Sequence, residues 1–136
     1  MAAWPESKGE SLHTSTFLGN PLACAAALAS LKEMEEVIVP GEIQKKGERL
    51  LQRLTMGLSG NKAIREIRGI GLMLGIEFSP ESSIQAQTLS DCLLKRGLIT
   101  LPSGPRGEVL ALSPPLIIQQ EVFDWTVEVF KEELSM

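Results

Sequence analysis

The sequence predicts an α+β fold, in which helices pack on one face of a small, largely antiparallel sheet and a long apolar helix comes first. Two segments enriched in branched apolar residues, 64–68 and 72–78, are separated by a short glycine-containing connection, which is typical of strands that pair directly. The order from residue 42 onward is helix, two strands, helix, two strands, helix. That order favours helices on one side of an antiparallel sheet.

The first helix is expected over residues 21–36. Asn20 can accept hydrogen bonds from the first free backbone N–H groups, and Pro21 fits the first helical position, where its missing N–H needs no partner. The stretch Leu22–Leu31 is small and apolar almost throughout. Because a helix that is apolar all round is usually buried on all sides, we expect this helix to pack against a second domain or subunit.

The later elements are predicted from the spacing of apolar residues and from the glycines between them. A second helix is expected over 42–57, where the apolar residues are spaced for one face. Gly69 and Gly71 between the first two strands indicate a bulge or a sharp bend. The other predicted elements are a third helix over 83–96, a short strand over 98–101, a loop over 102–107, a strand over 109–112 and a last helix from 119 or 120 to 134.

Composition limits the classes of function. The chain has 136 residues and a formal net charge of −4, with 43% hydrophobic and 22% charged residues, which is ordinary for a globular domain. The negative charge disfavours nucleic acids and anionic membranes as partners. No signal peptide is evident and no apolar run is long enough to span a bilayer, so we expect a cytoplasmic protein. Cys24 and Cys92 are expected to be small buried hydrophobes.

A hydroxyl-rich segment precedes the first helix. The hydroxyls of Ser15 and Thr16 beside a helix N-terminus suit an anion, although the same residues can simply fill a turn. His13 is the only histidine, and no orienting group makes it a base for a neighbouring hydroxyl. No spacing of His, Cys, Asp and Glu fits a metal-ligand set. We therefore predict neither a catalytic residue nor a metal site in this chain.

Residues 13–28, HTSTFLGNPLACAAAL, closely resemble the segment that follows the catalytic lysine in class III, fold-type I pyridoxal-phosphate (PLP) aminotransferases. In that family the loop comes from one subunit and reaches the cofactor of its partner. The residue that matches Thr16 hydrogen-bonds the PLP phosphate across the dimer interface. The resemblance thus implies that Thr16, and less strongly Ser15, binds the cofactor.

A second segment, RGIGLMLGIEF over 68–78, is similar to the start of the small C-terminal domain of the same family. The organisation that the resemblance implies has two parts. Residues 1–36 would be the cofactor-phosphate loop and linking helix from the large domain, and residues 37–136 the small C-terminal α+β domain.

PLP chemistry needs a lysine that forms a Schiff base and an acid that holds the pyridinium nitrogen. In the family both precede the segment that matches residues 13–28, so we expect this chain to be a C-terminal fragment that is inactive alone. The full enzyme would be a transaminase that moves an amino group between an amine or amino acid and a keto acid. Its expected partner is a second copy, in a homodimer, or the missing N-terminal large domain.

The sequence departs from the family pattern at one position. Many members place an arginine just before a Pro-Pro motif, where it binds the substrate carboxylate in bidentate fashion. Ala111 occupies that position, ahead of Pro114 and Pro115. Either the carboxylate is bound otherwise or the substrate lacks one there. Arg106 in the nearby loop is the candidate replacement, and a solvated loop arginine is the alternative.

Two other functions stay open at this point. One is a PLP-dependent epimerase or aminomutase, since both occur on the same scaffold in this family. The other is a non-catalytic α+β module that dimerises through the apolar helix and has no affinity for PLP.

Overall fold

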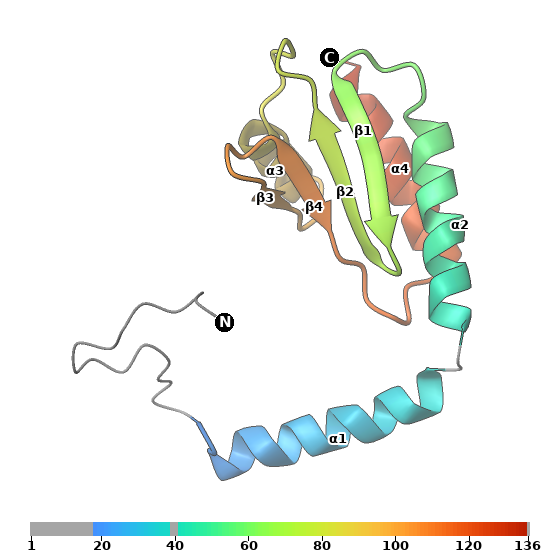
Figure 1. Cartoon of the computed structure of the whole chain (residues 1–136), viewed down its shortest axis with the longest axis vertical. Helices are drawn as coiled ribbons and strands as arrows, with labels where there is room; N and C mark the ends of the chain where they lie inside the picture. The colour runs from blue at the N-terminus through green and yellow to red at the C-terminus, as the bar shows by residue number, and fades with distance from the viewer. Residues whose placement is uncertain (1–17, 39–40, 136) are drawn as a thin grey trace, which may run out of the picture. The chain divides into compact units, whose positions relative to one another are not determined.

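A computed structural model of the chain describes residues 18–38 and 41–135. The chain divides into two compact units, of which the first ends at Glu36 and the second begins at Val37 (Figure 1). Each unit is described separately below.

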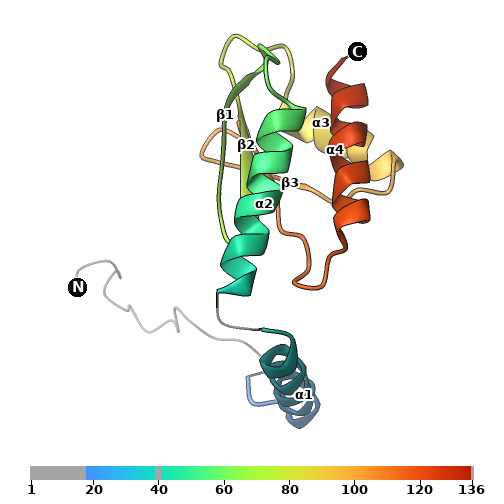
Figure 2. The same cartoon turned by 90° about the vertical axis from the view of Figure 1, so that its right-hand side faces the viewer.

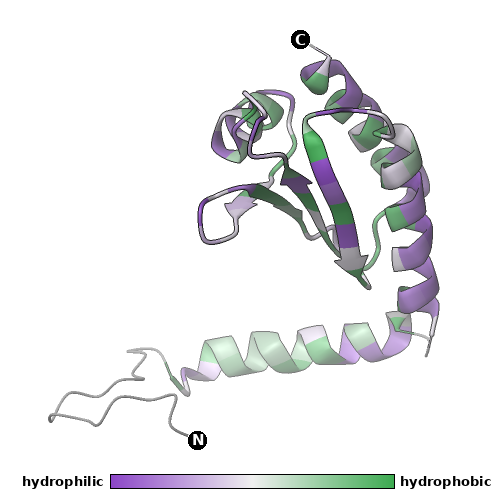
Figure 3. Ribbon diagram, turned by 45° about the horizontal axis from the view of Figure 1, so that its top comes forward, coloured by the Kyte–Doolittle hydropathy of each residue, from purple (hydrophilic) through white to green (hydrophobic). Residues whose placement is uncertain are grey.

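The described part of the first unit is mainly helix α1 (Pro21–Val37), whose last residue is counted with the second unit. Asn20 caps it: its Oδ1 accepts hydrogen bonds from the backbone N–H groups of Leu22, at 3.0 Å, and Ala23, at 3.2 Å. Figure 3 colours the first half of α1 largely as hydrophobic, yet Leu22 is 82% exposed and Leu28 63%. Cys24 is exposed as well, so the prediction that it is buried was wrong. The prediction rested on the apolar character of the surrounding helix, and all residues from 21 to 36 are exposed.

The second unit has the predicted α+β architecture. Its four strands form one sheet in the order β1-β2-β4-β3, and every neighbouring pair is antiparallel. Helices lie on one face of that sheet (Figure 2). The elements are α2 (Glu42–Gly57), β1 (Ile64–Ile70), β2 (Met73–Phe78), α3 (Ala86–Lys95), β3 (Leu101–Ser103), β4 (Val109–Leu112) and α4 (Gln120–Leu134).

The third strand lies later in the chain than predicted. The prediction placed it over 98–101, whereas β3 covers Leu101–Ser103. The residues before it are tied to α3 instead of to the sheet, because Ser90 Oγ donates a hydrogen bond to the Thr100 carbonyl and accepts one from the Thr100 hydroxyl, both at 3.0 Å. Pro102 is compatible with β3 because β3 is an edge strand.

The core lies between the sheet and its helices. Alternation along β2 buries Leu74, Ile76 and Phe78 toward the helices. The largest fully buried side chains are Phe123, Phe130, Leu50, Leu54, Ile76, Leu93, Leu110, Val127 and Val129. Cys92 on α3 is only half-buried, so it is not the core residue that the sequence predicted.

Two glycines let α2 approach the sheet closely. Gly71 forms the turn between β1 and β2 with a φ of 54°, which agrees with the predicted sharp bend. A Cβ atom on Gly47 of α2 would overlap the backbone carbonyl of Gly71. The β-bulge is elsewhere, between Ile64 and Glu66 near the start of β1.

Candidate functional site

The face of the sheet away from the helices, here called the open face, carries Ala111. Strand register places Arg68 beside Gly75, Gly75 beside Ala111 and Ala111 beside Leu101. These four residues form one row across β1, β2, β4 and β3. Ala111 therefore lies between a glycine and a leucine, so its immediate neighbours in the row are uncharged.

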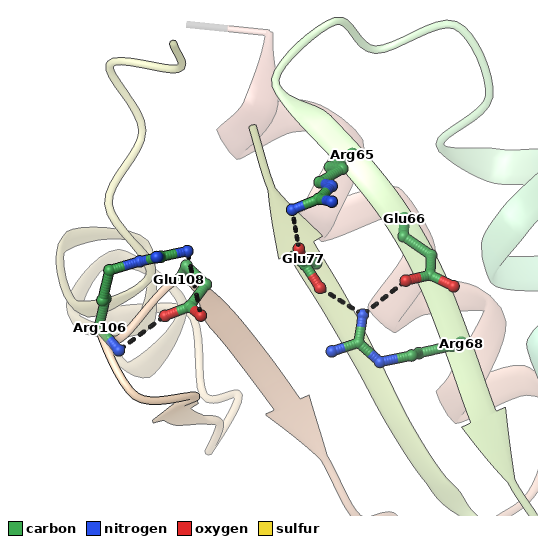
Figure 4. Close-up of polar contacts among 6 residues, drawn as sticks. All are labelled: Arg65, Glu66, Arg68, Glu77, Arg106 and Glu108. Carbon is green, nitrogen blue, oxygen red and sulfur yellow. Dashed lines mark hydrogen bonds and ion pairs between the residues drawn. The ribbon is translucent and has the colours of Figure 1, made fainter. Parts of the chain in front are cut away.

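The arginine in that row is held by carboxylates. Arg68 Nη1 donates to Glu77 Oε2 at 2.6 Å and to Glu66 Oε2 at 2.8 Å. Arg65 Nη1 donates to the other oxygen of Glu77, Oε1, at 2.9 Å (Figure 4). The hydrogen bond to Glu77 is the main reason that the pKa of Arg68 is raised. Its charge is thus already paired with carboxylates of β1 and β2.

Arg106 lies in the hairpin between β3 and β4, beside Gly107, whose φ is 70°. Its backbone N–H donates to Glu108 Oε2 at 2.8 Å, and its Nη2 lies 3.7 Å from Glu108 Oε1. Backbone N–H groups of Glu108 and Arg106 hold the pKa of the Glu108 carboxyl below its usual value. Arg106 contacts Glu108 and precedes β4, whereas Ala111 is the third residue of β4. The structure does not bring the two together, and a role of Arg106 in substrate binding stays a prediction.

Ser15 and Thr16, the predicted cofactor ligands, lie outside the described residues. Asn20, which caps α1, is the described residue that bears on this prediction. Because Asn20 Oδ1 takes the backbone N–H groups of Leu22 and Ala23, those two donors are not available to an anion. Binding of a phosphate here would therefore depend on groups that precede Asn20, which include the Ser15 and Thr16 hydroxyls.

A groove of about 720 Å³ opens at one end of the sheet, and it was not predicted from the sequence. Its lining includes Arg65, Glu77, Arg106 and Glu108 together with the start of α3. The alternating charges of Ile64–Arg68 are the only sequence signal for this cluster. They could not identify Glu77 as the shared partner, because that depends on the register of β1 against β2.

Two absences concern the described residues only. Within 18–38 and 41–135 no group of three or more His, Cys, Asp and Glu side chains could hold a metal ion. None of the helices in the same ranges is long and apolar enough to cross a membrane.

Sequence comparison extends over nearly the whole chain. Residues 1–134 match the model of the family described as aminotransferase class-III. The chain is 36% identical over 124 residues to an acetylornithine aminotransferase of Synechocystis. This match covers 90% of this chain but 28% of that protein. It is 40% identical over 113 residues to an ornithine aminotransferase of Bordetella pertussis, covering 83% of this chain and 26% of that one.

Solved structures give the same result. A Bacillus anthracis aminotransferase superposes with a TM-score of 0.75 at 28% identity, over 96% of this chain and 32% of that one. An acetylornithine aminotransferase from Elizabethkingia anophelis superposes with a TM-score of 0.73 at 30% identity, over 93% and 33%. The chain thus spans about a third or less of the length of the relatives that it matches. Its sequence match and its fold agree, and the chain belongs to the class III aminotransferase family.

Proposed function

We propose that this chain is the C-terminal part of a PLP-dependent transaminase that moves an amino group between an amine or amino acid and a keto acid. The observation that carries the proposal is the family match over residues 1–134. The matched relatives are named acetylornithine and ornithine aminotransferases, which supports amino transfer as the reaction class. PLP, when bound, would supply the electron sink for that chemistry.

The residues that would hold the cofactor are hydroxyl donors. Thr16, with Ser15 beside it, would donate hydrogen bonds to phosphate oxygens, and both hydroxyls have the chemistry for that task. The Asn20 cap supports this assignment indirectly, because it occupies the N–H groups of Leu22 and Ala23, so that a phosphate would need donors that precede Asn20. The proposed partner is a second copy in a homodimer or an N-terminal large domain.

The open face supports a proposal about the substrate. Ala111 replaces an arginine that the family resemblance leads one to expect, and the nearest arginine in its row is bound to Glu77 and Glu66. The substrate group that faces Ala111 would then be uncharged. An amine donor without a carboxylate at that end fits this surface better than an α-amino acid.

The experiment is a PLP titration of two proteins. One is the 136-residue chain, and the other is a chimera in which this chain replaces the matching C-terminal part of the Synechocystis relative. The chain alone should show no amino transfer with PLP and an amine donor, whereas the chimera should bind PLP. Thr16→Val replaces the hydroxyl by a methyl group and should weaken PLP binding by about tenfold or more, since a hydrogen bond to a charged group contributes about 1.5–3 kcal/mol.

Thr14→Val is the matched control for that titration. It removes a neighbouring hydroxyl for which we propose no cofactor contact, so its PLP affinity should equal that of the unmodified chimera. A Thr16→Val chimera that binds PLP as tightly as the Thr14→Val chimera would contradict the assignment of Thr16. Amino transfer by the chain alone would contradict its proposed status as a fragment.

A further inference from the structure

The groove at the end of the sheet is built from four separate segments. The end of β2 and the residues after it contribute Phe78–Pro80, and the start of α3 contributes Gln85–Gln87. The β3–β4 hairpin contributes Pro102 and Arg106–Glu108, and Arg65 reaches in from β1. Its volume of about 720 Å³ is in the range of pockets that hold small organic molecules.

Two arginines with unused donors line this groove. A guanidinium carries five N–H donors. The contacts found in the described ranges use one nitrogen of Arg65, Nη1, for Glu77. Arg106 has an ion pair with Glu108 at 3.7 Å, and its guanidinium makes no hydrogen bond to any residue that the structure describes. Each arginine therefore keeps donors that a bound anion could use.

The two acidic residues in the lining do not cancel these donors. Glu77 is engaged on both oxygens, by Arg65 and by Arg68. Glu108 accepts the backbone N–H of Arg106 at 2.8 Å. Both carboxylates are thus paired with arginines, and the N–H groups of Arg65 and Arg106 that these contacts do not use remain available to a ligand.

The start of α3 also favours a bound anion. Gln85 is the N-cap of this ten-residue helix and makes no side-chain capping hydrogen bond, and no acidic residue lies in the first turn. The partial positive charge of the helix start is therefore uncompensated. The rest of the lining combines apolar Pro80, Ile84 and Pro102 with the hydroxyl groups of Ser79 and Ser82.

We propose that this groove binds a small organic oxyanion, with its carboxylate or phosphate group between Arg106, Arg65 and the start of α3 and a short apolar body against Ile84 and the prolines. Charge-assisted hydrogen bonds from guanidinium groups provide the recognition. This site uses neither of the residues proposed as cofactor contacts, Ser15 and Thr16. It is also independent of whether the chain takes part in amino transfer.

The test follows backbone amide NMR signals of the complete 136-residue chain without PLP. Inorganic phosphate and butyrate are titrated separately at constant ionic strength, with potassium chloride as the reference salt, so that the two arms tell a phosphate from a carboxylate ligand. We expect the amide signals of Gln87 and Arg106 to move saturably with at least one probe. Arg106→Gln should weaken that binding by about fivefold or more.

Two further variants separate binding from folding. Arg49→Gln removes an exposed arginine of α2 that does not line the groove, and it should bind like the unmodified chain. Gln85→Asp supplies a better N-cap, so it should preserve or raise the melting temperature while its negative charge weakens anion binding. Absence of a saturable shift with both probes, or equal affinity in Arg106→Gln, Gln85→Asp and the unmodified chain, would overturn the proposal.

Discussion

Arg68 of β1 and Glu77 of β2 form an ion pair with a distance of 2.6 Å between Nη1 and Oε2. This ion pair affects the charge near Ala111. Arg68 shares that row with Gly75 and Ala111, but its guanidinium is committed to Glu77 and Glu66. The surface above Ala111 therefore lacks the positive charge that the register alone would place near it.

Ala111→Arg should change substrate preference in the chimera. Ala111 is on the open face, beside Gly75 and Leu101, where a longer side chain has room away from the core. A guanidinium there should raise kcat/KM for α-amino acid donors, relative to donors without that carboxylate, by about tenfold. The measurement is the ratio of kcat/KM for a matched pair of donors. Ala111→Gln, which is long but uncharged, should leave the ratio unchanged, and a ratio unaffected by arginine would contradict the proposed position of the substrate.

Gly47→Ala should destabilise the chain although alanine is the better helix former. A Gly→Ala change within a helix ordinarily stabilises by up to about 1 kcal/mol. Here the new methyl group would overlap the Gly71 carbonyl, and backbone must move to admit it. We expect a net loss of about 1–3 kcal/mol in the free energy of unfolding, measured in urea. Gln44→Ala, at an exposed position of the same helix, is the control and should be within about 0.5 kcal/mol of the unmodified chain. A more stable Gly47→Ala variant would show that α2 does not contact the β1–β2 turn.

The ion pair between α2 and α4 should make stability depend on pH. Arg53 Nε donates to Asp124 Oδ1 at 2.6 Å, and this hydrogen bond is the main reason that the pKa of Asp124 is lowered. A carboxyl group with a lowered pKa stabilises the folded state above its unfolded pKa, about 3.9. That contribution is lost as the pH falls through the lower folded value.

Asp124→Asn is the variant that measures this effect. It should be less stable than the unmodified chain at pH 7, and the difference should shrink as the pH is lowered below about 4. Added salt should also reduce it, because both side chains are partly exposed. The measurement is the melting temperature of both proteins at each pH. A difference that stays constant from pH 7 to pH 3 would rule out the ion pair as its cause.

Much of the fold could be predicted from local signals. Spacing of apolar residues located α2 and α4, and β4 was found at its observed bounds, 109–112. The Asn20 cap was evident because its chemistry is local and needs only the next few residues. β3 was misplaced because its position depends on the Ser90–Thr100 hydrogen bonds. These bonds join α3 to the segment that follows it, and apolar spacing does not reveal them.

Less of the candidate sites could be predicted from the sequence. The Arg65–Glu77–Arg68 cluster depends on strand register and on the bulge at the start of β1. The groove depends on where the β3–β4 hairpin comes to lie beside the start of α3. Ala111 was identified only because a family resemblance supplied an expectation for that position. Thr16 and Ser15 lie outside the described residues, so their role rests on the same resemblance.

The most direct test of the central proposal is amino transfer by the chimera of the Synechocystis N-terminal part with this chain. Product formation is measured with PLP, a panel of amines and α-amino acids, and a keto acid, alongside the isolated chain. We expect the chimera to transfer the amino group and the isolated chain to be inactive. A chimera that folds and binds PLP but transfers no amino group from any donor would contradict the proposal that this chain is part of a transaminase.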